Sequence, residues 1–121
     1  MTSTEQHQEL LKKYAEVVVR VGLNLRAGQQ LSIRTATHTV PLVREITRVA
    51  YQQGASLVDV IWADESVSRA RAEFAPRDSY EEFPIWQVDG TMKIIEKGGA
   101  LLSIAAVDPD LLNGLVMMPL W

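Results

Sequence analysis

Apolar residues recur every three to four positions over the first part of the chain, which is the spacing of an amphipathic helix. The pattern predicts a helix over residues 4–22, with Ser3 or Thr4 as its cap and Gly22 at its end. The apolar side of this predicted helix comprises Leu10, Leu11, Tyr14, Val17, Val18 and Val21.

The pattern then changes to that of β-strands. Residues 31–35 (LSIRT) follow a turn at Ala27-Gly28 and alternate between apolar and polar, which predicts a short strand. Residues 55–62 (ASLVDVIW) form an apolar run interrupted by one charge, Asp59, which predicts a strand covered on both faces.

A helix is predicted between these two strands. Thr37 or Thr39 can cap it, Pro41 lies in its first turn, and Gly54 ends it. A strand, a helix and a second strand in succession form a βαβ unit, so the two strands are expected to be parallel.

A helix over residues 64–74 is predicted next, supported by Glu65 and Arg69 at four-residue spacing, and it ends before Pro76. Asp64 and Glu65 lie in its first turn, where the helix dipole favours negative charge by about 0.3–1 kcal/mol. Capping therefore explains this carboxylate pair without a catalytic role.

Another helix is predicted over residues 79–97. The segment from Ser79 to Glu82 has the spacing of a capping box, which also accounts for its two adjacent glutamates. Pro84 kinks or restarts this helix, and the pair Gly98-Gly99 ends it.

Residues 100–106 (ALLSIAA) predict a third strand and residues 108–114 (DPDLLNG) a short helix. The fold class is therefore α/β, with a mostly parallel sheet of three or more strands, helices on its faces and a leading N-terminal helix. The pattern does not determine the strand order. We assign residues 1–114 to this domain and residues 115–121, an apolar run, to a tail. This tail is either an exposed interaction surface or an irregular segment packed on the domain.

Composition narrows the functional classes. The 121 residues suffice for one domain with one core. A net charge of −3 without a basic block argues against nucleic-acid binding. The absence of Cys excludes disulfides, thiolate metal sites and thiol nucleophiles. The N-terminus lacks the order of a signal peptide and no apolar stretch reaches membrane-spanning length, so we expect a cytoplasmic protein without a membrane partner.

The candidate ligand site is the turn TATHT, which follows the first predicted strand. Open α/β sheets bind ligands at this end of their strands, and the free N–H groups of a helix attract anions. In this interpretation Thr35, Thr37, His38 and Thr39 form a cradle for an anion or a carboxylate. In the alternative, which the lack of a Gly-rich loop and of a following Lys favours, the threonines are caps and turn residues and His38 is simply exposed.

Other polar and aromatic residues have structural explanations. His7 and His38 are the only histidines, and a zinc site would need both with distant carboxylates, so no metal site is expected. Asp59 either pairs with Arg34 across the sheet or points outward at a strand edge. Without a basic groove for nucleic acid, the aromatic residues are expected in the core or an interface; they include Trp62, Tyr80, Phe83, Trp86 and Trp121.

The run KKYAEVVVRVGLNLRAGQQLSIRT resembles the opening of the aminopeptidase T and aminopeptidase S family, also called the thermophilic metalloprotease family. The shared features are a Tyr-containing helix, a Val-Gly-Leu-Asn end and an Ala-Gly-Gln turn before the first strand. The resemblance continues through VPLVREITRVAYQQGASLVDVIWADE, DSYEEFPIW and EKGGALLSIAAVDPDLLNG, so it covers nearly the whole chain up to about Gly114.

This resemblance implies an enzyme that releases N-terminal amino acids from peptides. Such an enzyme uses a two-metal site, with Co²⁺, Zn²⁺ or Mn²⁺, in which carboxylate and His ligands activate a water. The family's Glu, His, Tyr and Asp ligands lie in a C-terminal domain, beyond the region that this chain resembles. No catalytic, cofactor-binding or metal-binding residue therefore carries over to this sequence.

We accordingly expect the N-terminal, non-catalytic domain, or a truncated form, of a metal-dependent aminopeptidase. Its expected partners are the catalytic C-terminal domain, a peptide substrate only in that context, and a second copy in a homodimer. By itself the chain is expected to be inactive. The tail of residues 115–121 departs from the family pattern, through a cut or a shift of reading frame.

Two alternatives remain open. The first is a stand-alone small α/β binding domain that uses the turn at residues 35–39 for an anionic ligand. The second is an interaction module that dimerises through the apolar tail.

Overall fold

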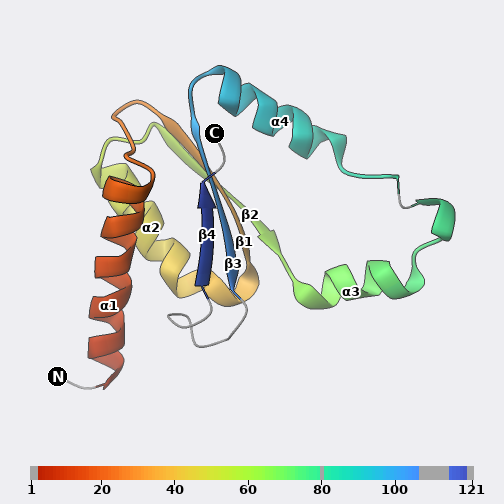
Figure 1. The fold of residues 1–121 in the computed structure, drawn as a ribbon, viewed down its shortest axis with the longest axis horizontal. Helices are drawn as coiled ribbons and strands as arrows, with labels where there is room; N and C mark the ends of the chain where they lie inside the picture. The colour runs from red at the N-terminus through yellow and green to blue at the C-terminus, as the bar shows by residue number, and fades with distance from the viewer. Residues whose placement is uncertain (1–2, 80, 107–114, 120–121) are drawn as a thin grey trace.

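A four-stranded sheet forms the centre of the computed structural model, which describes residues 3–79, 81–106 and 115–119 (Figure 1). The strand order is β2-β1-β3-β4, in which β1, β2 and β3 run parallel and β4 is antiparallel to β3. The strands are β1 (Gln30–Ala36), β2 (Leu57–Ala63), β3 (Ala100–Ala106) and β4 (Leu115–Pro119). The helices are α1 (Ser3–Val17), α2 (Val40–Gln52), α3 (Glu65–Phe74) and α4 (Ile85–Glu96). The predicted α/β class with a mostly parallel sheet and a leading helix is confirmed.

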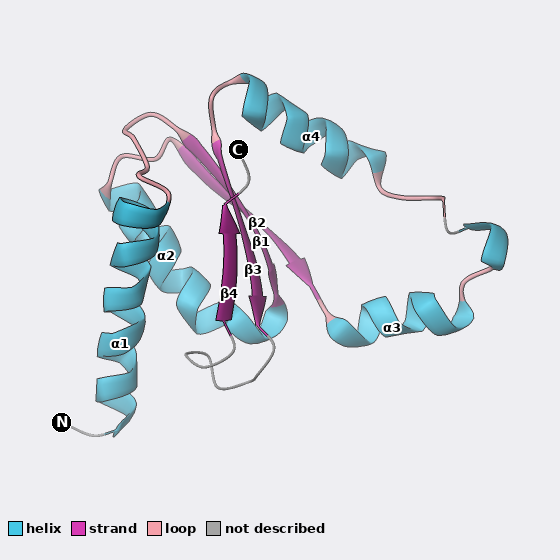
Figure 2. Cartoon of the chain, viewed as in Figure 1, coloured by secondary structure: helices cyan, strands magenta, loops and turns pink. Residues whose placement is uncertain are grey.

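Helices lie on both sides of the sheet, with α1 and α2 on one side and α4 on the other, whereas α3 extends away from the end of β2 (Figure 2). The strand order accounts for this arrangement. The connection through α2 steps from β1 to β2, and the connection through α3 and α4 steps back across β1 to β3. Parallel crossovers are almost always right-handed, so two steps in opposite directions place their helices on opposite faces.

The core lies on the face covered by α1 and α2. Strand residues alternate between faces, so Leu31 and Ile33 of β1 point to the same side as Leu102 and Ile104 of β3. All four are buried and pack with apolar residues of the two helices, among them Leu11, Ala15, Leu42, Ile46 and Val49. The opposite face carries Ser32 and Arg34, and α4 approaches it.

The leading helix covers the predicted span, because α1 continues into a π-helical turn, η1 (Val18–Gly22). Its predicted apolar side is partly wrong, however. Leu11, Val18 and, in part, Tyr14 are covered, whereas Leu10, Val17 and Val21 are exposed. The π-helical turn, marked by the bond from Leu23 N–H to Val18 O at 2.8 Å, changes the residue spacing at the end of the helix. The buried stripe there becomes Val18 and Val19.

The second strand is not covered on both faces, which corrects the prediction from its apolar sequence. None of the residues of β2 is buried, and Leu57 and Trp62 are among the exposed large side chains. The strand lies at the edge of the sheet, where it has a neighbouring strand only on one side. Its composition reflects strand propensity more than burial.

The predicted helix over residues 79–97 begins later than expected. A short 3-10 turn, η3 (Arg77–Ser79), comes first, and α4 starts only after Pro84. The Ser79 hydroxyl donates to Pro76 O at 2.5 Å, so the expected capping box is not formed and the adjacent glutamates are not in the first turn of a helix. Proline disfavours a helical residue before it, which explains why the helix starts beyond it.

The backbone of the apolar tail forms a strand where an irregular or exposed segment was expected. Residues 115–119 pair with β3 in an antiparallel register that matches Leu115 with Ala106 and Pro119 with Leu102. The predicted short helix over residues 108–114 lies outside the described residues.

Candidate functional site

A cavity of about 450 Å³ lies at the carboxyl ends of the three parallel strands. The chain moves from β1 to β2 on one side and later to β3 on the other, so this is the point where the strand order reverses. Open α/β sheets bind ligands in such a crevice. Its walls come from β1 and the turn after it, from the start of α3 and from β3; they include Arg34, Thr35, His38, Asp64, Glu65, Ser68 and Ser103.

Two of the four predicted site residues form a hydrogen bond with each other. Thr35 and Thr39 are buried, and their hydroxyl oxygens are within hydrogen-bond distance. The Thr39 hydroxyl donates to Ala36 O at 2.8 Å, so the Thr35 hydroxyl is the donor between the two threonines. Thr39 precedes α2 but makes no side-chain cap bond to it, which corrects the expected capping role. This pair holds the turn together.

The other two predicted site residues, Thr37 and His38, are exposed. The Thr37 hydroxyl donates to Asp64 Oδ1 at 3.5 Å, a long contact that links the turn after β1 to the start of α3. His38 lines the cavity. The four residues therefore divide into an inward pair and an outward pair, and the anion cradle stays a prediction.

The cavity carries charges of both signs. Arg34 and His38 face it together with the carboxylates of Asp64 and Glu65. The Arg34 guanidinium also donates to the Thr91 hydroxyl of α4, which joins β1 to the helix above it. The sequence pattern did not bring Asp64 and Glu65 to this site, because only the strand order places the ends of β1, β2 and β3 beside one another.

The face of the sheet towards α4 contains a second, smaller cavity of about 250 Å³. Asp59 is exposed there and pairs in register with Ser32, whereas Arg34 pairs with Ile61 and donates to Thr91. Of the two roles expected for Asp59, the exposed position on an edge strand is therefore the one observed, and the pair with Arg34 is not formed. The buried Ser32 hydroxyl has no hydrogen-bond partner among the described residues.

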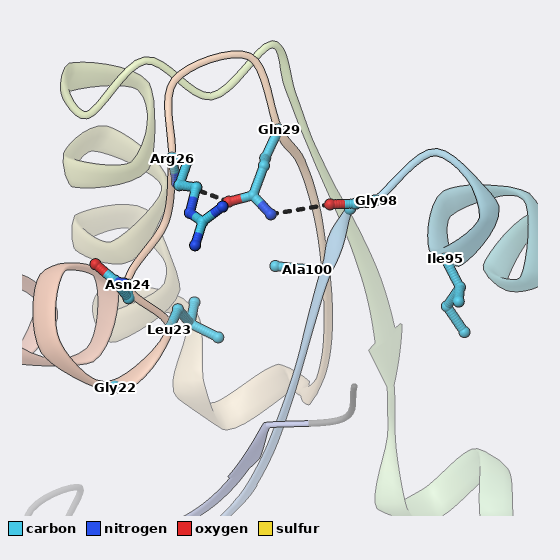
Figure 3. Close-up of a pocket in the computed structure, with 9 residues that line it drawn as sticks. Gly22, Leu23, Asn24, Arg26, Gln29, Ile95, Gly98 and Ala100 are labelled. Carbon is cyan, nitrogen blue, oxygen red and sulfur yellow. Dashed lines mark hydrogen bonds between the residues drawn. The ribbon is translucent and has the colours of Figure 1, made fainter.

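A third cavity, of about 590 Å³, lies at the amino ends of the strands (Figure 3). The Gln29 side chain accepts a bond from Arg26 N–H at 2.6 Å and donates to Gly98 O at 2.9 Å. One amide group therefore ties the turn before β1 to the turn before β3. This role was not predictable from the sequence, in which Gln29 is only a polar residue that precedes a strand.

The described residues hold no set of side chains that could bind a metal ion. Within residues 3–79, 81–106 and 115–119, no three His, Cys, Asp or Glu side chains come together in a group that could hold a metal ion. The described residues thus do not fit the two-metal centre that the family resemblance implies.

In the same part of the chain, the helices are too short or too polar to cross a bilayer.

The known proteins that this chain resembles in sequence include several aminopeptidases. Aminopeptidase AmpS of Bacillus subtilis is 34 % identical over 92 % of this chain and 27 % of its own length. Aminopeptidase 2 of Geobacillus stearothermophilus is 39 % identical over 85 % of this chain and 25 % of its own length. The chain therefore spans about a quarter of the curated relatives that it matches.

A solved structure, wild-type AmpT from Thermus thermophilus, has a similar fold with a TM-score of 0.75 and 37 % identity. The match covers 88 % of this chain and 27 % of that one. The sequence profile described as Thermophilic metalloprotease (M29) matches residues 7–117, well over half of the chain. From this match and these relatives, the chain belongs to the thermophilic metalloprotease family.

Proposed function

We propose that this chain serves as the N-terminal, non-catalytic domain of a metal-dependent aminopeptidase that releases N-terminal amino acids from peptides. One observation carries the proposal. The family match covers nearly all of this chain, yet the chain corresponds to only the N-terminal quarter of its relatives. The lack of a metal-ligand group among the described side chains agrees with chemistry located elsewhere.

In this function the domain is a scaffold. Its core, between the sheet and the pair α1 and α2, is made of buried side chains of its own residues. The metal ions, Co²⁺, Zn²⁺ or Mn²⁺, and the peptide substrate belong to that remainder. We place the domain at residues 1–114 and treat residues 115–121 as a tail whose first five residues extend the sheet. A cytoplasmic location and a homodimer are part of the same proposal.

The test is a domain exchange in full-length Geobacillus aminopeptidase 2. Residues 7–117 of this chain, which match the family profile, replace the corresponding segment of that enzyme. The chimera should hydrolyse an N-terminal aminoacyl substrate in the presence of Co²⁺, Zn²⁺ or Mn²⁺. The isolated chain, assayed with the same metals, should give no turnover. Metal-dependent hydrolysis by the isolated chain, or a folded chimera without activity, contradicts the proposal.

A second proposed function is binding of a small anion at the turn of residues 35–39. It is supported by the position of His38 and Arg34 on the cavity where the strand order reverses. Calorimetric titration with inorganic phosphate should then give measurable binding that the double substitution T37V/H38A removes. Thr35 and Thr39 are left unchanged in this test because they hold the turn. Absence of phosphate binding by the unaltered chain contradicts this function.

A further inference from the structure

The connection from β2 to β3 carries large apolar side chains that the described residues of this chain leave exposed. We call residues 65–96, which comprise α3, η3 and α4, the arm. In Figure 1 the arm leaves the end of β2, runs away from the sheet and returns through α4 to β3. Neither α3 nor α4 has a buried residue, in contrast to α1 and α2. Its exposed large apolar residues are Val67, Phe74, Phe83, Ile85, Trp86, Val88, Met92 and Ile95.

These exposures are large for aromatic residues. Phe74 is 81 % exposed and Trp86 is 72 % exposed. A large aromatic side chain removes much apolar area from water when it is buried, and aromatic residues are enriched at the centres of protein interfaces. Several large apolar side chains exposed along one connection, two of which, Phe83 and Trp86, line the same cavity, indicate an interaction surface.

The arm also has an internal structure of its own. The Arg71 guanidinium of α3 donates to Glu82 O in the segment before α4, which ties the two halves of the arm together. A cavity of about 330 Å³ lies at this junction, between Arg71, Phe83, Pro84 and Trp86. Ser79 and Glu82 also line it, so the cavity combines an apolar wall of Phe83, Pro84 and Trp86 with a polar rim. Such a site is suited to an aliphatic or aromatic side chain of a partner.

The lengths of the relatives indicate what covers the arm. About three-quarters of the AmpT chain lies outside the part that matches this chain. In such relatives the matched segment is joined covalently to that further chain, which is therefore at high effective concentration beside the arm. A second copy of this chain has no such advantage.

We propose that the arm is the docking surface for the catalytic remainder of a family member, with Phe74, Phe83 and Trp86 as its apolar anchors. This inference rests on the proposed function, since it names the surface through which the N-terminal domain would hold its catalytic partner. It predicts that the arm is accessible in the isolated chain and buried in a full-length enzyme.

Thiol labelling tests the proposal, because the chain contains no Cys. Phe74→Cys places a thiol on the arm, and Val21→Cys places a matched control on η1, where the side chain is 73 % exposed and distant from the arm in the chain. Each substitution is introduced into the isolated chain and into the Geobacillus chimera. Labelling rates are followed by mass spectrometry of the peptide that contains each position.

The thiol at position 74 should react in the chimera roughly tenfold or more slowly than in the isolated chain, because a buried thiol reacts only from opened states. The thiol at position 21 should react at similar rates in both. Equal rates for position 74 in the two proteins overturn the proposal. Slow labelling already in the isolated chain, with a dimer in sedimentation, assigns the arm to a second copy and also overturns it.

The labelling does not depend on turnover, so the two proposals fail separately. An active chimera with an accessible position 74 leaves the proposed function intact and removes the docking surface. An inactive, folded chimera with a protected position 74 contradicts the proposed function and leaves the docking surface intact. If the chimera does not fold, the same labelling is carried out at the aligned position of full-length Geobacillus aminopeptidase 2, where an accessible thiol equally overturns the proposal.

Discussion

At Gly99 the turn that leads into β3 leaves no room for a side chain. A Cβ atom there would lie 2.5 Å from Ile94 Cγ2, 2.9 Å from Ile94 O and 3.0 Å from Gln30 O. Two of these three atoms are backbone oxygens, which cannot move aside as a side chain can. Gly90, in the middle of α4, has no atom within 4 Å of the same position. In the same connection, glycine is therefore required at position 99, whereas position 90 has room for a side chain.

Gly99→Ala should lower the free energy of unfolding by about 1–3 kcal/mol, the usual cost of overpacking. Gly90→Ala should raise it by roughly 0.5–1 kcal/mol, because Ala has the higher helix propensity. Urea unfolding followed by circular dichroism measures both. Equal effects of the two substitutions would mean that the turn before β3 is looser than the structure has it.

Thr39 is the second informative residue, because it is fully buried and its hydroxyl bonds to Ala36 O and Thr35. Thr39→Val keeps the shape but leaves the Thr35 hydroxyl and Ala36 O without this partner. The expected loss is about 1–3 kcal/mol of unfolding free energy. Thr39→Ser, which keeps the hydroxyl, is the control and should lose less; the reverse order would show that the methyl group matters more than the bonds.

Among the described elements, α2 has the most buried residues, and it contacts both α1 and the sheet. Leu42, Val43, Ile46, Val49 and Ala50 of this helix are all buried. By contrast, α3 buries none of its residues, although its sequence and its ion pair between Arg69 and Glu65 at 3.1 Å are those of a good helix. That pair is exposed at both ends, so it supports the helix only weakly.

Ile46→Ala should therefore lower the unfolding free energy by about 2–5 kcal/mol, since it empties space in a closed core. Val21→Ala removes an exposed apolar side chain and should change stability by less than about 0.5 kcal/mol. Chemical denaturation of the two variants provides the comparison. A small effect at Ile46 would contradict the packing of α2 against the sheet.

For the molecule as a whole, the fourth strand decides how the sheet ends. β4 covers the outer edge of β3 by antiparallel pairing. An uncovered strand edge presents free N–H and C=O groups to other molecules. Residues 115–119, which the sequence predicted to be irregular or an exposed surface, are thus part of the sheet.

Deletion of residues 115–121 should lower the melting temperature and increase self-association, because the edge of β3 becomes free. Sedimentation velocity and thermal unfolding check both effects. If the tail were instead a dimer interface, the deletion would yield a more monomeric protein, and this result would favour the alternative in which the chain dimerises through its tail.

The sequence by itself determined the local structure: helical spacing, strand propensity and the Gly and Pro residues that end elements are local properties, and α2, α3 and β1 fall where these signals predict them. The family likewise followed from residues in order along the chain. Only the tertiary structure decided that β2 is an edge strand and that β4 closes the other side, because pairing partners are distant in sequence. The same holds for the candidate site, where Asp64 and His38 line one cavity only because β1 and β2 end side by side.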